Sequence, residues 1–155
     1  MKRRVVFSSK GKNAMHYPIK IGKISVTFLQ SRHETDGAFD LFELIVPPNA
    51  FLNVPHLHRD YDETILGMNG IATWIIEGER FQIGPGQQLN IPRGTVHSYT
   101  NFHTTTSRMM CLLTPGLVGP EYFRELAAVI QPDGPPDIAE ISTVMARYGV
   151  IPITP

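Results

Sequence analysis

The chain has 155 residues, of which 42% are hydrophobic, and its 14 Lys and Arg residues balance its 14 Asp and Glu residues. This length suits a single domain, and the balanced charge argues against a strongly basic nucleic-acid binder. The one cysteine, Cys111, excludes an internal disulfide framework and leads us to expect a reducing, cytoplasmic compartment. No apolar run approaches the roughly 18–20 residues of a membrane span, so we expect no membrane partner.

The charge is unevenly distributed along the chain. Residues 1–23 contain seven basic residues and no acidic one. Such a run is found in arms that bind RNA or anionic lipid. A solvated strand or tail that complements an acidic neighbour is the simpler interpretation.

Short runs rich in Val, Ile, Phe, Tyr and Thr lie between closely spaced glycines and prolines, which predicts β-strands. In chain order these runs cover residues 21–29, 38–46, 71–77, 79–83, 97–102 and 107–113. Short strands at a spacing of roughly 8–12 residues are typical of a sandwich or barrel. We therefore predict an all-β fold in which residues 1–30 supply N-terminal strands and residues 31–115 form the barrel core.

The pattern becomes helical after Gly119, where apolar residues recur at steps of three and four as far as Ile130. Pro120 suits a first helical position. Asp137 is expected to begin a second helix that ends at Gly149. These helices are too short to form a domain alone. We therefore predict that residues 116–155 are a helical appendix packed on the barrel and that residues 1–155 form one domain.

Four residues of metal-ligand type stand at informative positions. His56 and His58 are two positions apart, so they point to the same side of an extended chain. Glu63 follows after room for a tight turn and can return on the adjoining strand. The sequence at 92–94, Pro-Arg-Gly, predicts a turn that delivers His97 to the next strand. Imidazole suits Zn, Cu, Fe and Ni, and an oxygen donor also admits Mn. The set therefore predicts a site for one divalent transition metal.

These segments resemble the paired motifs of the cupin superfamily, a small jelly-roll β-barrel. The first family motif consists of a glycine, His-x-His, a glutamate and a second glycine. The chain has His56-x-His58, then Glu63 after four residues and Gly70 after six more, with Ala50 at the leading glycine. The second motif is matched in full by residues that share its spacing: Gly86, Pro92, Gly94, His97 and Asn101. The tail, at 114–116, 121–124 and 147–149, is similar to that of bacterial single-domain cupins described as quercetin dioxygenase-like.

The resemblance implies a cupin jelly roll with short C-terminal helices and one divalent metal (Fe, Mn, Ni, Cu or Zn) held by His56, His58, Glu63 and His97. It also implies a small-molecule substrate and a homodimer. Apolar strands at 21–29 and 39–46 favour the same dimer, because exposed strand edges need to be paired or covered.

Our leading hypothesis is an enzyme, a metal-dependent dioxygenase acting on a small oxygenated substrate such as an enediol or a flavonol-like phenol. Glu63 is the candidate catalytic residue, which holds the metal and accepts the substrate's hydroxyl proton. Two alternatives stay open, since a fold does not determine a function. One is an isomerase or decarboxylase that uses the metal as a Lewis acid. The other is a non-catalytic cupin that binds a small ligand.

Other residues fit structural roles. His16, His33 and His103 fall outside the motif spacing and are expected to lie on the surface or in hydrogen bonds. Cys111 is expected to be a small core residue. Four further residues are expected in the core: Trp74, Phe81, Met109 and Met110. Tyr99 has the strand parity of His97, and alternation alone leaves open whether it faces the cavity.

Overall fold

The computed structural model describes residues 16–50, 54–130 and 133–153. Most of the basic segment at 1–23 lies outside the described residues. The elements in chain order are β1 (Ile19–Ile21), β2 (Ile24–Gln30), β3 (Asp40–Val46), β4 (His56–His58), β5 (Asp62–Asn69), β6 (Ala72–Ile76), β7 (Glu79–Ile83), β8 (Gln88–Ile91), β9 (His97–Thr100), β10 (Ser107–Thr114), α1 (Gly119–Val129), α2 (Ile138–Arg147) and β11 (Val150–Pro152).

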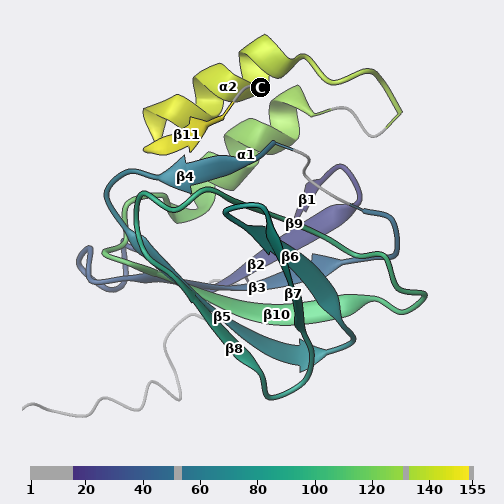
Figure 1. Ribbon diagram of the computed structural model, residues 1–155. Coiled ribbons are helices and arrows are strands. Elements are labelled where there is room, and N and C mark those ends of the chain that lie inside the picture. Colours follow the sequence, from purple (N-terminus) through teal and green to yellow (C-terminus); the bar gives the residue numbers. More distant parts are fainter. Residues whose placement is uncertain (1–15, 51–53, 131–132, 154–155) are drawn as a thin grey trace, which may run out of the picture.

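The strands form two antiparallel sheets that face each other (Figure 1). The larger sheet has six strands in the order β1-β2-β3-β10-β5-β8, and the smaller has five in the order β11-β4-β9-β6-β7. From β3 to β6 and from β7 to β10 the chain changes sheet at each successive strand, which is the crossing pattern of a jelly roll. The prediction of an all-β jelly-roll barrel with short helices is confirmed.

Alternation along the strands places the core between the sheets. In β3 and β10 every second side chain is buried, and the side chains between them are partly exposed. This two-residue period follows from strand geometry. Trp74, Met109 and Cys111 are at most 1% exposed, as predicted for core residues. Met110 is only half-buried because it points from β10 to the outer face.

Phe81 was wrongly predicted to be a core residue. Its side chain is 39% exposed. It lies on β7, the edge strand of the smaller sheet, where four of the five residues are exposed. Phe81 and Ile83 correctly predict a strand in this segment, but they do not indicate that the strand lies at the edge of the sheet.

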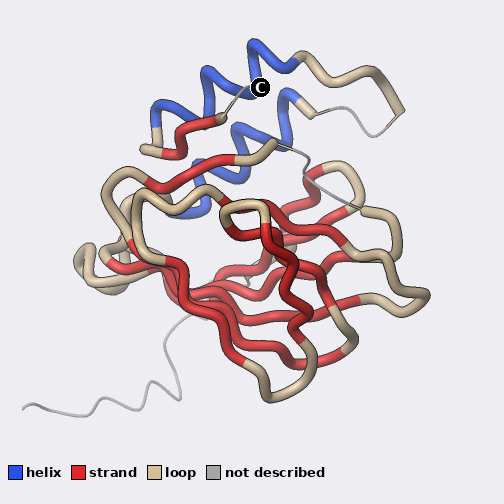
Figure 2. Tube along the Cα trace, viewed as in Figure 1, coloured by secondary structure: helices blue, strands red, loops and turns tan. Residues whose placement is uncertain are grey.

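The two helices lie together over one end of the barrel (Figure 2). Asp137 caps α2 by accepting a hydrogen bond from the backbone N–H of Glu140. The chain then returns to the smaller sheet as β11, which pairs with β4 and places Val150 opposite His58 and Pro152 opposite His56. The sequence pattern did not predict β11, because three residues that end in a proline carry no strand period.

Gly67 allows β5 to pass close to the loop before β8. A Cβ at this position would lie 2.0 Å from the carbonyl oxygen of Gly84, which is part of the backbone and cannot move aside cheaply. A glycine is therefore required where these two segments approach each other.

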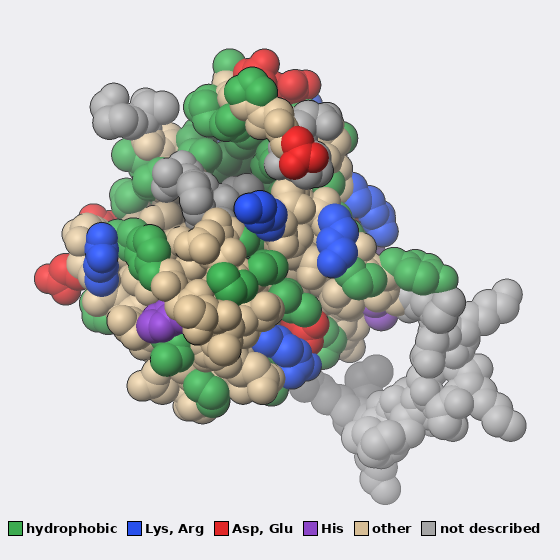
Figure 3. Space-filling view, turned by 90° about the vertical axis from the view of Figure 1, so that its right-hand side faces the viewer, with side chains coloured by type: hydrophobic (Ala, Val, Ile, Leu, Met, Phe, Trp, Pro, Cys, Tyr) green, Lys and Arg blue, Asp and Glu red, His purple; other side chains and the backbone are tan. Residues whose placement is uncertain are grey.

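No helix in the described ranges is long and apolar enough to cross a membrane. On the face shown in Figure 3, Lys and Arg side chains are dispersed among apolar and neutral ones and do not form one continuous patch.

Asp40 anchors the start of α1 to the barrel. It is fully buried at the start of β3. One carboxylate oxygen accepts from the backbone N–H of Arg32 at 2.7 Å. The other accepts from Val118 at 3.1 Å and Gly119 at 3.2 Å. These last two donors stand at the first turn of the helix, where N–H groups lack partners within the helix.

We expect Asp40→Ala to destabilise the fold by about 2–3 kcal/mol, because it leaves buried N–H donors without an acceptor. Thermal unfolding followed by circular dichroism should show a fall in Tm of about 5–10 °C. Asp133→Ala is the matched control, since Asp133 is exposed, and its Tm should stay near wild type. Equal Tm values for the two variants would contradict the anchoring role of Asp40.

Candidate metal centre

The sequence-predicted histidines converge inside the barrel. His56 and His58 come from β4, and His97 begins β9, the strand beside it. His56 and His97 are direct partners in the sheet. The three side chains are buried, and each offers a ring nitrogen within 4.8 Å of the others. The antiparallel pairing of β4 with β9 creates this proximity between residues that are about 40 positions apart in the chain.

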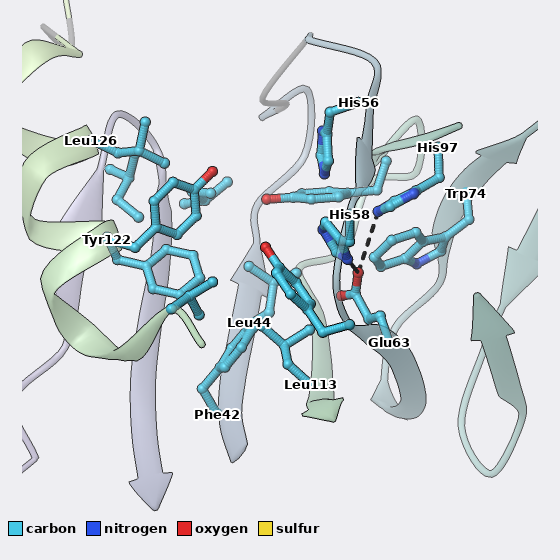
Figure 4. Close-up of a pocket in the computed structure, with 16 residues that line it drawn as sticks. Phe42, Leu44, His56, His58, Glu63, Trp74, His97, Leu113, Tyr122 and Leu126 are labelled. Carbon is cyan, nitrogen blue, oxygen red and sulfur yellow. Dashed lines mark ion pairs between the residues drawn. The ribbon is translucent and has the colours of Figure 1, made fainter. Parts of the chain in front are cut away.

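Glu63 reaches the same point from the opposite sheet. It lies on β5, paired with Leu113 on one side and Ile91 on the other. Its Oε2 is 3.3 Å from His97 Nε2 and 3.7 Å from His58 Nδ1. These are the two contacts drawn as dashed lines in Figure 4. Glu63 therefore contacts two of the three imidazoles, while the group whose ligand atoms all lie within 4.8 Å of one another consists of His56, His58 and His97.

Backbone carbonyls fix the orientation of two histidines. His56 Nδ1 donates to the carbonyl of Val54 at 2.8 Å, and His97 Nδ1 donates to that of Thr95 at 2.9 Å. A carbonyl oxygen only accepts, so Nδ1 carries the proton in each ring. The neutral tautomer then leaves Nε2 with a free lone pair. Such a hydrogen bond on the second ring nitrogen is the usual support of a metal-binding histidine.

The local electrostatics keep two of the histidines neutral. Burial, followed by repulsion from a charged His97 and His58, lowers the pKa of His56 to about 3. Burial and the neighbouring His97 likewise lower the pKa of His58 to about 3. For His97, burial lowers the pKa, but the Glu63 carboxylate and the Thr95 carbonyl outweigh it and the pKa is raised. Unprotonated His56 and His58 are the forms that bind a metal.

The donor atoms fit a metal ion. His58 Nδ1 and His97 Nε2 are buried and have no hydrogen-bond partner among the described residues. Buried polar atoms of this kind are rare in native proteins and need an explanation. These residues could hold a divalent cation, which would satisfy the two nitrogens and offset the charge of the Glu63 carboxylate beside them.

The turn before His97 is tied to both ligand-bearing segments. Gly94 takes a φ of +81°, a left-handed conformation suited to glycine. Its N–H donates to the carbonyl of His58 at 2.8 Å. Next to it, Arg93 donates through its backbone N–H and its side chain to Asp62, the residue before Glu63. One turn therefore sets the relative positions of three strands.

The centre opens on an apolar pocket that ends at helix α1 (Figure 4). The labelled walls are Trp74, Phe42, Leu44 and Leu113 from the strands and Tyr122 and Leu126 from α1. Among the described residues that line the pocket, none is Lys or Arg, and Glu63 is the one acid. The pocket walls therefore keep water away from the centre, and they contribute no Lys or Arg charge to it.

Several residues behave as expected outside the centre. His16 and His33 are exposed, and His33 contacts Glu121. His103 is half-buried and donates its backbone N–H to the side chain of Asn101. Asn101, the last residue of the second motif, also donates to the carbonyls of Val46 and Thr105 and holds loops together.

Aromatic residues near the centre are only partly apparent in the sequence. Tyr99 lines the pocket, so its side chain faces the inside of the barrel, which the sequence alone had left open. Tyr61 stacks on His58 with ring centroids 4.4 Å apart, and Tyr122 comes from the distant helix α1. Neither was identified, although the proximity of Tyr61 to His58 in the sequence was an available signal. Burial raises the pKa of Tyr61, Tyr99 and Tyr122, so all three remain protonated phenols.

Comparisons with known proteins agree with this geometry. Residues 42–113 match the family model for the cupin domain. The chain is 33% identical over 96 residues to quercetin 2,3-dioxygenase of Bacillus subtilis (strain 168). That match covers 62% of this chain and 28% of the Bacillus protein, so the chain spans well under two thirds of this relative.

Solved structures share the fold. KdgF from Halomonas sp. superposes with a TM-score of 0.56 at 20% identity, covering 66% of this chain and 89% of that one. The polyketide cyclase RemF from Streptomyces resistomycificus gives 0.54 at 23% identity, covering 74% and 80%. Residues 42–113 therefore match the cupin domain, and the chain resembles quercetin dioxygenase-like proteins over its matched region.

Proposed function

We propose that this protein is a metal-dependent dioxygenase that acts on a small oxygenated organic substrate. His56, His58, His97 and Glu63 hold one divalent transition metal. The observation that carries the proposal is a pair of buried nitrogens, on His58 and His97, that lie beside a carboxylate and have no hydrogen-bond partner in the described part of the chain. The match to a quercetin 2,3-dioxygenase supports oxygen chemistry as the reaction class.

The residues of the chain have distinct roles in this proposal. A bound divalent transition metal supplies Lewis acidity and a binding position for a substrate oxygen. The three histidines stay fixed, and His56 and His97 are held by carbonyls. Glu63 accepts the proton of the substrate hydroxyl at Oε2, the oxygen that faces His58 and His97. The apolar walls exclude water from the reacting atoms.

The proposed partners are small molecules. The balanced charge and the dispersed basic side chains of Figure 3 provide no continuous basic patch on that face for nucleic acid. Cys111 is buried and free, which supports a cytoplasmic compartment as the proposed location.

We expect the protein purified without added metal to carry close to one transition-metal ion per chain. His97→Ala should lower the metal affinity by more than the roughly 10–100-fold cost of losing a supporting group. Elemental analysis measures the metal content per chain, and competition with a chelator measures the metal affinity. His103→Ala is the matched control, because His103 lies outside the centre, and it should keep its metal. Full metal content in His97→Ala would contradict the proposed centre.

Glu63→Gln should retain the fold and lose turnover, because an amide cannot accept the proton. Oxygen uptake with the substrate that wild type oxidises, found in a panel of enediols and flavonols, should fall roughly 10²–10⁴-fold. Glu79→Gln makes the same change at an exposed position and should leave the rate unchanged.

Two outcomes would favour the alternative functions. Undiminished turnover without O₂ would indicate an isomerase or decarboxylase that uses the metal as a Lewis acid. Tight retention of a ligand with no product in the metal-loaded protein would indicate a binding module.

We also propose a homodimer, but its interface is an exposed apolar patch and not the exposed strand edges expected from the sequence. β2 and β3 are paired on both sides within the six-stranded sheet, so they do not present the exposed edges expected from the sequence. The outer face of that sheet instead exposes Leu66 and Met68 on β5, beside half-buried Met110 on β10. A second copy related by a two-fold axis would cover this patch.

Light scattering at micromolar concentration should give twice the mass of one chain. The double variant Leu66→Lys and Met68→Lys should give the mass of one chain, because it places charge on the patch. Ile138→Lys, at an exposed apolar residue on α2, should leave the dimer intact. A wild-type protein that is monomeric under these conditions would refute the dimer.

A further inference from the structure

The pocket beside the metal centre is small. Its free space is about 60 Å³. A cavity that takes up one benzene molecule has a volume of roughly 150 Å³. Pockets for drug-sized ligands are larger still, about 300–1,000 Å³. A substrate with an aromatic ring therefore does not fit between the centre and the far wall as the walls stand.

Tyr122 forms that far wall. It lies on α1, on the side of the pocket opposite the histidines and Glu63, and its side chain extends from the helix into the pocket (Figure 4). The residue is only 6% exposed. Helix α1 follows the region that matches the cupin family, which ends at residue 113. The size of the space is therefore limited by a segment outside the barrel motifs.

The wall is held in place from several sides. The Tyr122 ring packs against Phe123, with ring centroids 5.0 Å apart, and against Tyr148 at 5.2 Å. At the start of the helix, buried Asp40 accepts from two N–H groups. Arg32 also donates to the carbonyl of Leu117, just before the helix. Displacing the Tyr122 ring to admit a larger ligand would disrupt packing on both sides of it.

We propose that Tyr122 sets the upper size limit of the substrate, so that the centre takes an acyclic enol or enediol and excludes an aromatic ring. This inference rests on the proposed function, since it assigns the substrate class of the same centre. It also chooses between the two substrate types that the sequence left open. The relevant contact is steric, between the Tyr122 ring and the part of the substrate that points away from the metal.

A matched pair of probes tests this inference. Acetohydroxamate and benzohydroxamate chelate a metal through the same two oxygens and differ in carrying a methyl or a phenyl group. In Co²⁺-loaded wild type, absorbance titration should show that acetohydroxamate binds and benzohydroxamate binds more weakly. In Tyr122→Ala the affinity for benzohydroxamate should rise by about 10–100-fold, the gain from burying one phenyl group. The affinity for acetohydroxamate should change little.

Three further variants separate the steric effect from other causes. Tyr122→Phe keeps the ring and should retain the wild-type ratio of affinities. Phe28→Ala removes a similarly buried ring that packs on Phe123 but does not line the pocket, and it should also retain the ratio. Tyr122→Leu is a smaller truncation and should shift the ratio of affinities in the direction expected for Tyr122→Ala. It replaces Tyr122→Ala in the test if that variant does not fold.

A measurement on metal-free protein makes the test independent of the metal centre. Benzene should raise the Tm of Tyr122→Ala, or of Tyr122→Leu, and leave the Tm of wild type unchanged, because a ligand stabilises the fold it binds. Wild type that binds benzohydroxamate as tightly as Tyr122→Ala, or folded Tyr122→Ala and Tyr122→Leu variants that still exclude benzene, would overturn the inference. Failure to load Co²⁺ would instead contradict the proposed function, and the benzene result would still decide the size limit.

Discussion

The structure depends on keeping nitrogen lone pairs inside an apolar barrel. His58 Nδ1 and His97 Nε2 are buried and have no hydrogen-bond partner within residues 16–50, 54–130 and 133–153. Each such atom costs about 1–3 kcal/mol when nothing satisfies it. Groups that hold the rings in place reduce this cost, and a cation bound by the histidines would offset it. The carbonyls of Val54 and Thr95 provide part of this support. Two facing sheets are needed because the imidazoles come from one and the carboxylate from the other.

Much of this centre could be predicted from the sequence because its signals are local. The His-x-His pair is set by the two-residue period of a strand, and the turn at 92–94 by Pro and Gly. The core positions of Trp74 and Met109 follow from the same alternation. Other features depend on distant partners and leave no local signal. Phe81 lies at a sheet edge, β2 and β3 are paired on both sides, and β11 pairs with β4. Periodicity shows that a strand exists but does not identify its neighbours.

The pocket combines a charged centre with walls that carry no cationic side chain among the described residues. A substrate that brings a negative charge would meet Glu63 with no Lys or Arg to compensate. Under the proposed function, a bound metal ion would neutralise such a charge only at the atoms that contact it. The remote part of a substrate should therefore be uncharged. Tyr61, Tyr99 and Tyr122 add hydroxyls to these walls without adding charge, because burial keeps them protonated.

The pairing of β4 with β11 has a consequence for how the protein folds. β4 is only three residues long, and a single residue pair, His56 with His97, joins it to β9. On its other side it depends on residues 150–152, which are remote in the chain. Closing a loop of this length costs entropy that the short pairing of β4 with β11 must offset. An ion bound by His56 and His58 would add stability to the same strand, so its binding should strengthen the hold of the C-terminal segment on the barrel.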